Sequence, residues 1–72
     1  MKVYLMNMWR FGECIQIVAE TKQKGYSALK ERYYEIYQHW NGEKPKAAEW
    51  KETKSDIEVF EMVLNKVFDP WG

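Results

Sequence analysis

The chain has 72 residues, with 11 basic and 11 acidic side chains, a formal net charge of zero and an aromatic fraction of 17%. That length fits one domain spanning residues 1–72, because chains divide into several domains only at much greater lengths. A hydrophobic fraction of 46% is too high for a disordered chain, and a single cysteine cannot form an internal disulfide. No apolar run reaches the roughly 18–20 residues of a membrane span, and the first residues lack the apolar stretch of a signal peptide. We therefore expect a small cytoplasmic α+β domain.

Residues 2–19 carry the pattern of a β-hairpin. Strand side chains alternate between two faces, and both faces of residues 2–9 are apolar, one formed by Val3, Leu5 and Trp9 and the other by Tyr4, Met6 and Met8. Residues 14–19 are apolar and β-branched, which predicts a second strand. Gly12, between the two runs, supplies the positive φ of a tight turn. A strand that is apolar on both faces is suited to being covered on both sides.

Apolar residues spaced three and four positions apart predict a helix from about residue 22 to residue 40. The stripe consists of Tyr26, Leu29, Tyr33, Ile36 and Trp40. Thr21 is suited to cap the helix, and Asn41-Gly42 is suited to end it. A later start near Ser27 stays open, because Gly25 costs about 1 kcal/mol inside a helix.

Residues 41–56 are rich in charge and give the weakest pattern of the chain. Pro45 is favoured at the first position of a helix, so residues 46–50 fit a helical turn or two. The alternative is a solvated connection in which Trp50 is the one anchor. The sequence leaves both structures open.

Residues 57–68 fit either a strand or a helix. As a strand, the β-branched content is favourable, but Glu61 interrupts the alternation. As a helix, Ser55 and Glu58 fit a capping box, in which the two side chains satisfy each other's free backbone N–H groups. Asp69-Pro70 then ends the helix. We predict the helix, with an apolar side formed by Ile57, Phe60, Val63, Leu64, Val67 and Phe68.

The predicted order is strand, strand, helix, connection and helix, which gives an α+β fold with an N-terminal hairpin packed against two amphipathic helices (ββα-α). A lone hairpin is only marginally stable, and its outer edges are left unpaired. Because both faces of the hairpin are apolar, a second copy of the chain can cover the face that the helices leave open. The other solution is a target strand that pairs with the hairpin edge.

The sequence offers no catalytic, cofactor or metal site. Cys14 and His39 are the only thiol and imidazole, whereas structural zinc sites take four ligands mostly of those types. Cys14 lies in a predicted strand among apolar residues, where it behaves as a small buried hydrophobe. The glycines stand singly, so no phosphate-binding loop is present. We expect a protein that is not an enzyme and has no cofactor.

Binding of single-stranded nucleic acid is the weaker of two functional hypotheses. Lysine and arginine hold phosphates while aromatic rings stack on bases, and both types interleave on the predicted helix 22–40. The contact set for this hypothesis is Lys22, Lys24, Lys30 and Arg32, together with Tyr34 and Tyr37. A net charge of zero argues against it, because nucleic-acid-binding domains usually carry a basic excess.

Docking on a protein partner, or on a second copy of the chain, fits more of the sequence. Aromatic residues dominate the energetics of protein interfaces, and this chain holds more of them than its predicted stripes can bury. The predicted contact set is Trp9, Phe11, Tyr34, Tyr37, Trp50 and Trp71. We therefore expect a protein-interaction module that forms homo-oligomers or binds a protein, without membrane contact.

In size and composition the chain resembles the small accessory proteins of phages and bacterial mobile elements. Many such proteins act by binding a host protein and inhibiting or redirecting it. The resemblance rests on overall character and on no motif, so it implies a docking function and assigns no functional residue.

Overall fold

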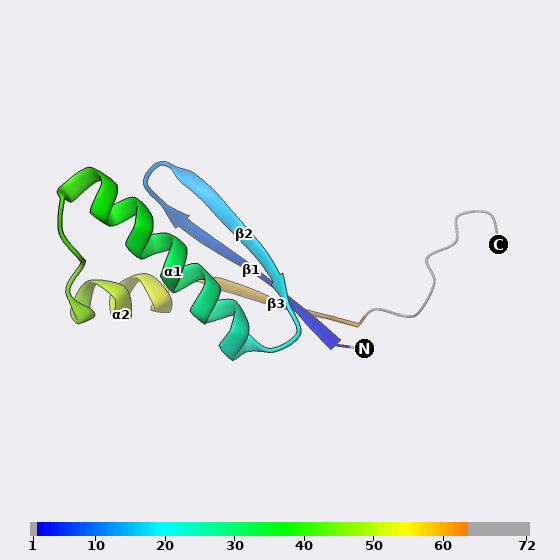
Figure 1. Ribbon diagram of the computed structural model, residues 1–72. Coiled ribbons are helices and arrows are strands. Elements are labelled where there is room, and N and C mark those ends of the chain that lie inside the picture. The colour runs from blue at the N-terminus through cyan, green and yellow to red at the C-terminus, as the bar shows by residue number, and fades with distance from the viewer. Residues whose placement is uncertain (1, 64–72) are drawn as a thin grey trace.

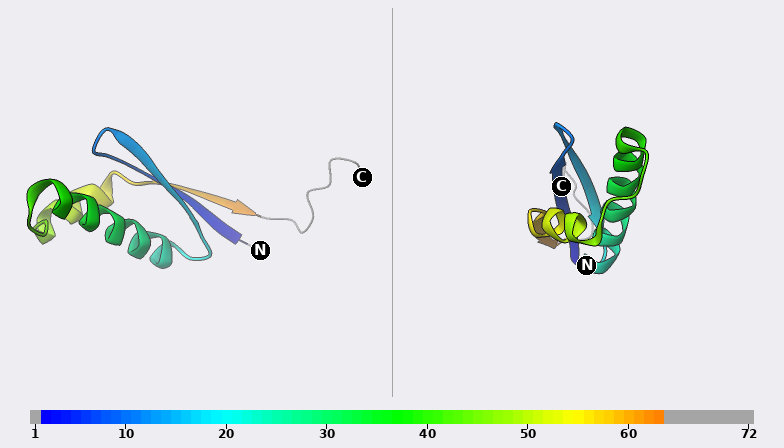
Figure 2. Two further views of the ribbon diagram at one scale, coloured as in Figure 1. Left: turned by 45° about the horizontal axis from the view of Figure 1, so that its top comes forward. Right: turned by 90° about the vertical axis from the view of Figure 1, so that its left-hand side faces the viewer.

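The computed structural model describes residues 2–63, which form a three-stranded antiparallel sheet with two helices packed on it. The elements in chain order are β1 (Lys2–Arg10), β2 (Glu13–Ala19), α1 (Lys22–Asn41), α2 (Ala47–Ser55) and β3 (Glu58–Val63). β1 is the central strand, with β2 and β3 on either side of it. Figures 1 and 2 show α1 running along one face of the sheet. The α+β fold predicted from the sequence is confirmed.

The hairpin at residues 2–19 is confirmed. β1 and β2 pair from Tyr4 with Ala19 to Arg10 with Glu13, so only two residues form the turn. Both of these residues, Phe11 and Gly12, have positive φ angles, of 56° and 76°. Positive φ at both central residues is typical of the turn whose twist matches two antiparallel strands.

Helix α1 begins and ends where its capping residues predict. The Thr21 side chain accepts a hydrogen bond from the Lys24 N–H at 3.1 Å, and Gly42 adopts the left-handed conformation with φ of 74°. The predicted burial of Trp40 is wrong, because this side chain is 73% exposed. Phe11 at the hairpin tip stacks on Tyr33, and Trp40 lies about two helical turns farther on. The end of α1 therefore extends beyond the part of the helix that the hairpin covers.

The predicted helix over residues 57–68 is wrong for the residues that the structure describes. Residues 58–63 form β3, which pairs antiparallel with β1 from Asn7 with Glu58 to Lys2 with Val63. Residues 64–68 lie outside the described part of the chain. The second helix is instead α2, which matches the shorter helix considered after Pro45. Ser55 ends α2 rather than capping a new helix, and its hydroxyl donates to the Glu52 carbonyl at 2.6 Å.

Glu61, which interrupts the apolar alternation of β3, has a partner on the neighbouring strand. Its carboxylate lies 3.2 Å from the Lys2 ammonium, and this contact raises the pKa of Lys2 above its usual value. Both side chains are largely exposed, so the acid meets water and a cation rather than the core. The interruption is therefore compatible with a strand.

The core lies between the helices and one face of the sheet. Its buried members are Met6, Met8, Leu29, Tyr33, Trp50 and Ile57. Trp50 packs its ring 5.8 Å from the ring of Tyr33, so it anchors α2 to α1 as the sequence suggests. Glu49 also joins the two helices, because it accepts bonds from the Lys46 N–H and from the Tyr37 hydroxyl.

Gly25 lets α1 lie close to the centre of β1. A Cβ atom placed on Gly25 would lie 2.2 Å from the Sδ of Met6, which is fully buried. Glycine is thus required here for a close approach between helix and strand, at the expense of helix propensity.

We predict that Gly25→Ala destabilises the protein by about 1–3 kcal/mol, the usual range for overpacking a core. Helix propensity alone gives the opposite sign, a gain of about 1 kcal/mol. Urea unfolding measures the difference. In a Met6→Val background, where the sulfur is absent, the same substitution is expected to be neutral or stabilising. Equal destabilisation in both backgrounds would contradict contact with Met6 as the cause.

Candidate functional site

The face of the sheet opposite the helices, here called the open face, carries apolar side chains in register. Leu5 of β1 pairs with Val18 of β2 and with Phe60 of β3, so these three residues form an apolar row across the whole sheet. Val18 is 56% exposed and Phe60 is 48% exposed. Among the described residues, both helices pack on the other face, with Met6 and Met8. The apolar row is therefore a surface without a described cover.

A polar row and an exposed tryptophan lie next to the apolar row. Gln16, Asn7 and Glu58 pair across the three strands, and Trp9 follows one alternation farther along β1. Trp9 is 58% exposed, and its indole Nε1–H donates to Glu58 Oε1 at 3.0 Å. Asn7 is 9% exposed, and its Oδ1 has no hydrogen-bond partner among the described residues. The open face thus combines apolar area, a large aromatic ring and a few polar groups.

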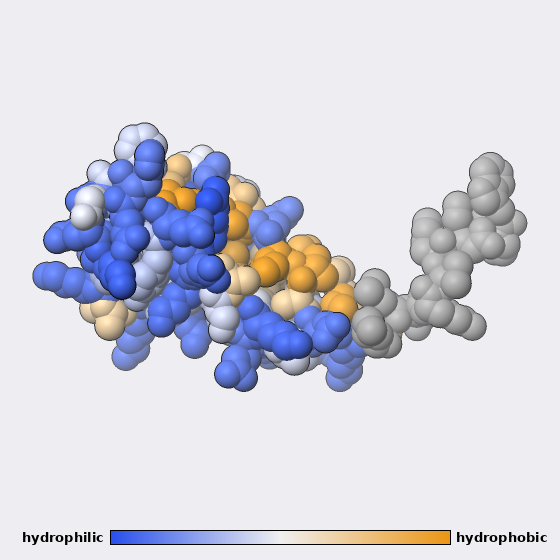
Figure 3. Space-filling model, in the orientation of Figure 1, coloured by the Kyte–Doolittle hydropathy of each residue, from blue (hydrophilic) through white to orange (hydrophobic). Residues whose placement is uncertain are grey.

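The open face holds no cation among residues 2–63. The strand residues that point away from the helices are Val3, Leu5, Asn7, Trp9, Cys14, Gln16, Val18, Glu58, Phe60 and Met62. Glu58 is the only carboxylate of this set, and it is bonded to the Trp9 indole. Figure 3 shows from the helix side that apolar surface gathers over the strands where they run past the helices, whose own surface is mostly hydrophilic.

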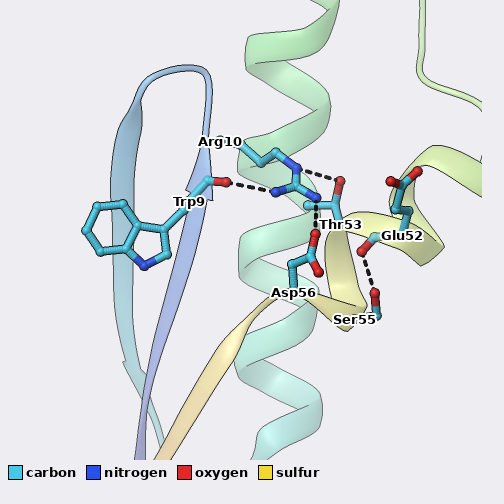
Figure 4. Close-up of polar contacts among 6 residues, drawn as sticks. All are labelled: Trp9, Arg10, Glu52, Thr53, Ser55 and Asp56. Atoms are coloured by element: carbon cyan, nitrogen blue, oxygen red, sulfur yellow. Dashed lines mark hydrogen bonds and ion pairs between the residues drawn. The ribbon is translucent and has the colours of Figure 1, made fainter.

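Arg10 ties the tip of the hairpin to the end of α2. Its guanidinium donates to Thr53 Oγ1 at 3.1 Å, to Asp56 Oδ2 at 2.7 Å and to the Trp9 carbonyl at 2.9 Å. Figure 4 shows the Arg10 side chain turned toward α2 and the Trp9 ring turned to the opposite side of the strand. The contacts of Arg10 therefore fix the backbone that carries Trp9.

Phe11 adds a second constraint at the same tip. Its φ of 56° is a conformation that bulky residues adopt rarely and at a cost of about 1–3 kcal/mol. The ring stacks on Tyr33 with centroids 5.4 Å apart and planes 29° apart, and it remains 39% exposed. The turn is thus held by packing against α1, and it presents part of an aromatic ring.

The structure does not bring the predicted protein-contact residues onto one surface. Trp9 and Phe11 are exposed at the hairpin tip, but on opposite sides of it. Tyr34 and Tyr37 are half-buried on α1 and pack against the core. The Tyr37 hydroxyl donates to Glu49 Oε1 at 3.2 Å, and this bond raises the pKa of Tyr37 above its usual value.

The remaining members of the predicted protein-contact set are Trp50 and Trp71. Trp50 is only 9% exposed and belongs to the core, so the exposure expected for it is not found. Trp71 lies outside the described residues. The sequence predicts an open apolar face on the hairpin, because both faces of β1 are apolar. It does not place Phe60 on that face, because residues 57–68 are predicted as a helix.

The basic residues predicted to bind nucleic acid do not form a continuous surface. Lys24 pairs with Glu20 at 3.6 Å, and Arg32 pairs with Glu35 at 3.1 Å, so acids neutralise both. Lys22 lies over the Tyr4 ring at the start of α1, and Lys30 lies over the Tyr34 ring farther along it. Only isolated cations are thus left to meet phosphates.

Other kinds of site were sought in residues 2–63. No group of three or more metal-ligating side chains occurs there, and no helix among these residues is long and apolar enough to cross a membrane. Cys14 is half-buried on β2, and His39 is exposed on the last turn of α1. No family model matches the chain, and no curated protein or solved structure gives a significant match. Function is therefore argued from the geometry.

We predict that Arg10→Lys lowers the free energy of unfolding by about 1 kcal/mol, because the ammonium keeps the charge but loses the forked bonds to Thr53 and Asp56. Arg32→Lys is the matched control, since its exposed pair with Glu35 is worth little. Urea unfolding compares the two variants. Equal stability of both variants and the wild type would show that the Arg10 contacts do not hold the hairpin tip.

Proposed function

We propose that the protein is a small interaction module that docks on a protein partner through the open face of its sheet. The observation that carries the proposal is the apolar row of Val18, Leu5 and Phe60, aligned across three strands and exposed at its two ends. Contiguous apolar surface of this kind is typical of interaction sites. Trp9 adds an aromatic side chain of the type that contributes most to interface energies.

The charge of the open face favours protein over nucleic acid as the occupant. Among the described strand residues of this face, Glu58 is the only charged side chain, and a carboxylate repels phosphate. The matching surface on the partner is apolar and bordered by hydrogen-bonding groups. A second copy of this chain has such a surface, because a two-fold axis brings the same apolar row onto itself. The other partner that fits is a host protein with a surface of this kind, to which an accessory protein of this size binds.

We predict that Val18→Lys and Phe60→Lys each weaken docking at least tenfold, because a lysine would be buried against apolar surface without a partner charge. Trp40→Lys is the matched control, since it removes a more exposed apolar side chain from the far end of α1. Light scattering measures self-association of all four proteins. Proteins retained on immobilised wild type are then purified and titrated against each variant.

The outcomes of this experiment separate clearly. A dimer or a purified partner that is lost with both strand variants and kept with the Trp40 variant supports the proposal. If the Trp40 variant loses the dimer or the partner to the same extent as the strand variants, the contact lies elsewhere. If the wild type is a monomer and the Val18→Lys variant binds every purified candidate as tightly as the wild type does, the open face is not the docking site.

We predict that labelled single-stranded oligonucleotides do not bind to the open face, even at low salt, where electrostatic affinity is greatest. The reason is that the described strands place no cation there. Fluorescence anisotropy at about 20 mM salt provides the measurement. Oligonucleotide binding that Val18→Lys strengthens and Trp9→Ala abolishes would assign the open face to nucleic acid instead.

A further inference from the structure

A hollow of about 400 Å³ lies between α1 and α2, on the helix side of the molecule. It is lined by Gln23, Tyr26, Ser27, Lys30, Trp50 and Lys54. The walls come from both helices, with Lys30 on α1 and Lys54 on α2. Hollows of this size are typical of sites for small molecules. The docking function proposed above does not use it.

Both lysines of this hollow lie against aromatic rings rather than against acids. Lys54 Nζ lies 4.8 Å from the centre of the Tyr26 ring, and Lys30 Nζ lies 5.6 Å from the centre of the Tyr34 ring. Neither forms an ion pair with a described residue, whereas Lys2 and Lys24 do. A ring face attracts an ammonium but leaves its N–H donors free. The Lys54 ammonium lies over a ring that lines the hollow, whereas the Lys30 ammonium lies at its border, over Tyr34 of the neighbouring hollow. Both keep N–H donors that can bind an anion.

The hollow is basic, although the net charge of the protein is zero. Its described lining has two lysines and no carboxylate, which gives a local charge of +2. The next hollow along α1 shares Lys30 but is also lined by Glu31 and Glu35. A phosphate backbone that continued along the helix would meet these two acids. The arrangement favours a small anion over a long nucleic-acid strand.

The remaining lining residues suit a ligand with a flat apolar part. Ser27 and Gln23 offer neutral hydrogen-bond donors beside the ammonium groups, and Trp50 and Tyr26 offer ring surface. Trp50 is itself buried, so the inner end of the hollow is apolar. Apolar surroundings strengthen the attraction between opposite charges.

We propose that this hollow, here called the lysine hollow, binds a small phosphate monoester that carries an aromatic or similarly flat group. Lys30 and Lys54 hold the phosphate oxygens from opposite helices, and Ser27 donates a further hydrogen bond. The flat group lies against the exposed edge of Trp50, beside the Tyr26 ring over which Lys54 lies. The site is on the opposite side of the sheet from the apolar row, so the two ligands bind independently.

Phenyl phosphate and inorganic phosphate are the probes that test the lysine hollow. At pH 8 both are mostly dianions, because the second phosphate pKa is about 6. NMR titration of the ¹⁵N-labelled full chain follows the Trp50 indole and the backbone amides of residues 23–30. We expect phenyl phosphate to bind about tenfold more tightly than inorganic phosphate, the factor that one favourable aromatic contact supplies.

Three variants locate the bound phosphate. Lys30→Gln and Lys54→Gln are each expected to weaken binding of phenyl phosphate about tenfold, because each removes one charged hydrogen bond. Lys51→Gln is the matched control, since Lys51 is exposed on the same helix as Lys54 but does not line the hollow. It is expected to change the affinity less than about twofold, as a distant surface charge does. Val18→Lys is expected to leave the affinity unchanged.

Each contrary result has a definite meaning. If Lys51→Gln weakens phenyl phosphate binding equally, the loss of affinity comes from general surface charge, and the site is overturned. Shifts that avoid the Trp50 indole and residues 23–30 would also overturn it. Tighter binding of a single-stranded oligonucleotide than of phenyl phosphate, lost with Lys30→Gln and Lys54→Gln, would overturn the small-ligand class in favour of nucleic acid. A normal hydrogen-exchange pattern in each variant confirms that the fold is kept.

Discussion

The central strand β1 is apolar on both faces, and the described helices cover only one of them. On the covered face, Met6 and Met8 are 0% and 1% exposed, and Gly25 allows α1 to lie directly over Met6. On the open face, Val3 and Asn7 of β1 are buried, at 5% and 9% exposed, whereas Trp9 of β1 is 58% exposed. The exposed apolar side chains of this face include Trp9 near the hairpin tip and Val18 and Phe60 on the neighbouring strands. The geometry of the sheet thus determines where a docking surface is available.

The zero net charge hides two surfaces of different chemistry. Among the described residues, the open face has apolar side chains and no cation, whereas the lysine hollow has two lysines and no acid. Other charged groups pair with each other, such as Arg32 with Glu35 on α1 and Lys2 with Glu61 on neighbouring strands. Summed over the chain, the positive and negative charges cancel. Net charge alone therefore argues against a phosphate site, whereas the local arrangement of the lysine hollow favours the one proposed.

Local signals made the first half of the fold predictable. Thr21, Gly12 and Gly42 act on the few residues next to them, so their effects could be read without knowledge of the rest of the chain. β3 was different, because its pairing with β1 joins Lys2 to Val63 across nearly the whole chain. Glu61 looked like a break in the alternation until its partner Lys2 was known. The part of the open face that β3 supplies was unpredictable for the same reason, since Phe60 aligns with Leu5 only through that pairing.

The strained hairpin tip bears on how the open face would bind. Phe11 keeps an unfavourable φ because its ring stacks on Tyr33, and Arg10 holds the strand before it to α2 through three hydrogen bonds. Both contacts lie on the helix side, yet they fix the backbone from which Trp9 projects to the other side. The Glu58 bond then restrains the indole itself. A side chain that is ordered before binding loses little entropy when a partner covers it, and this ordering increases affinity without any additional contact. In the proposed docking, the role of the helix layer is therefore to make the sheet rigid before a partner binds.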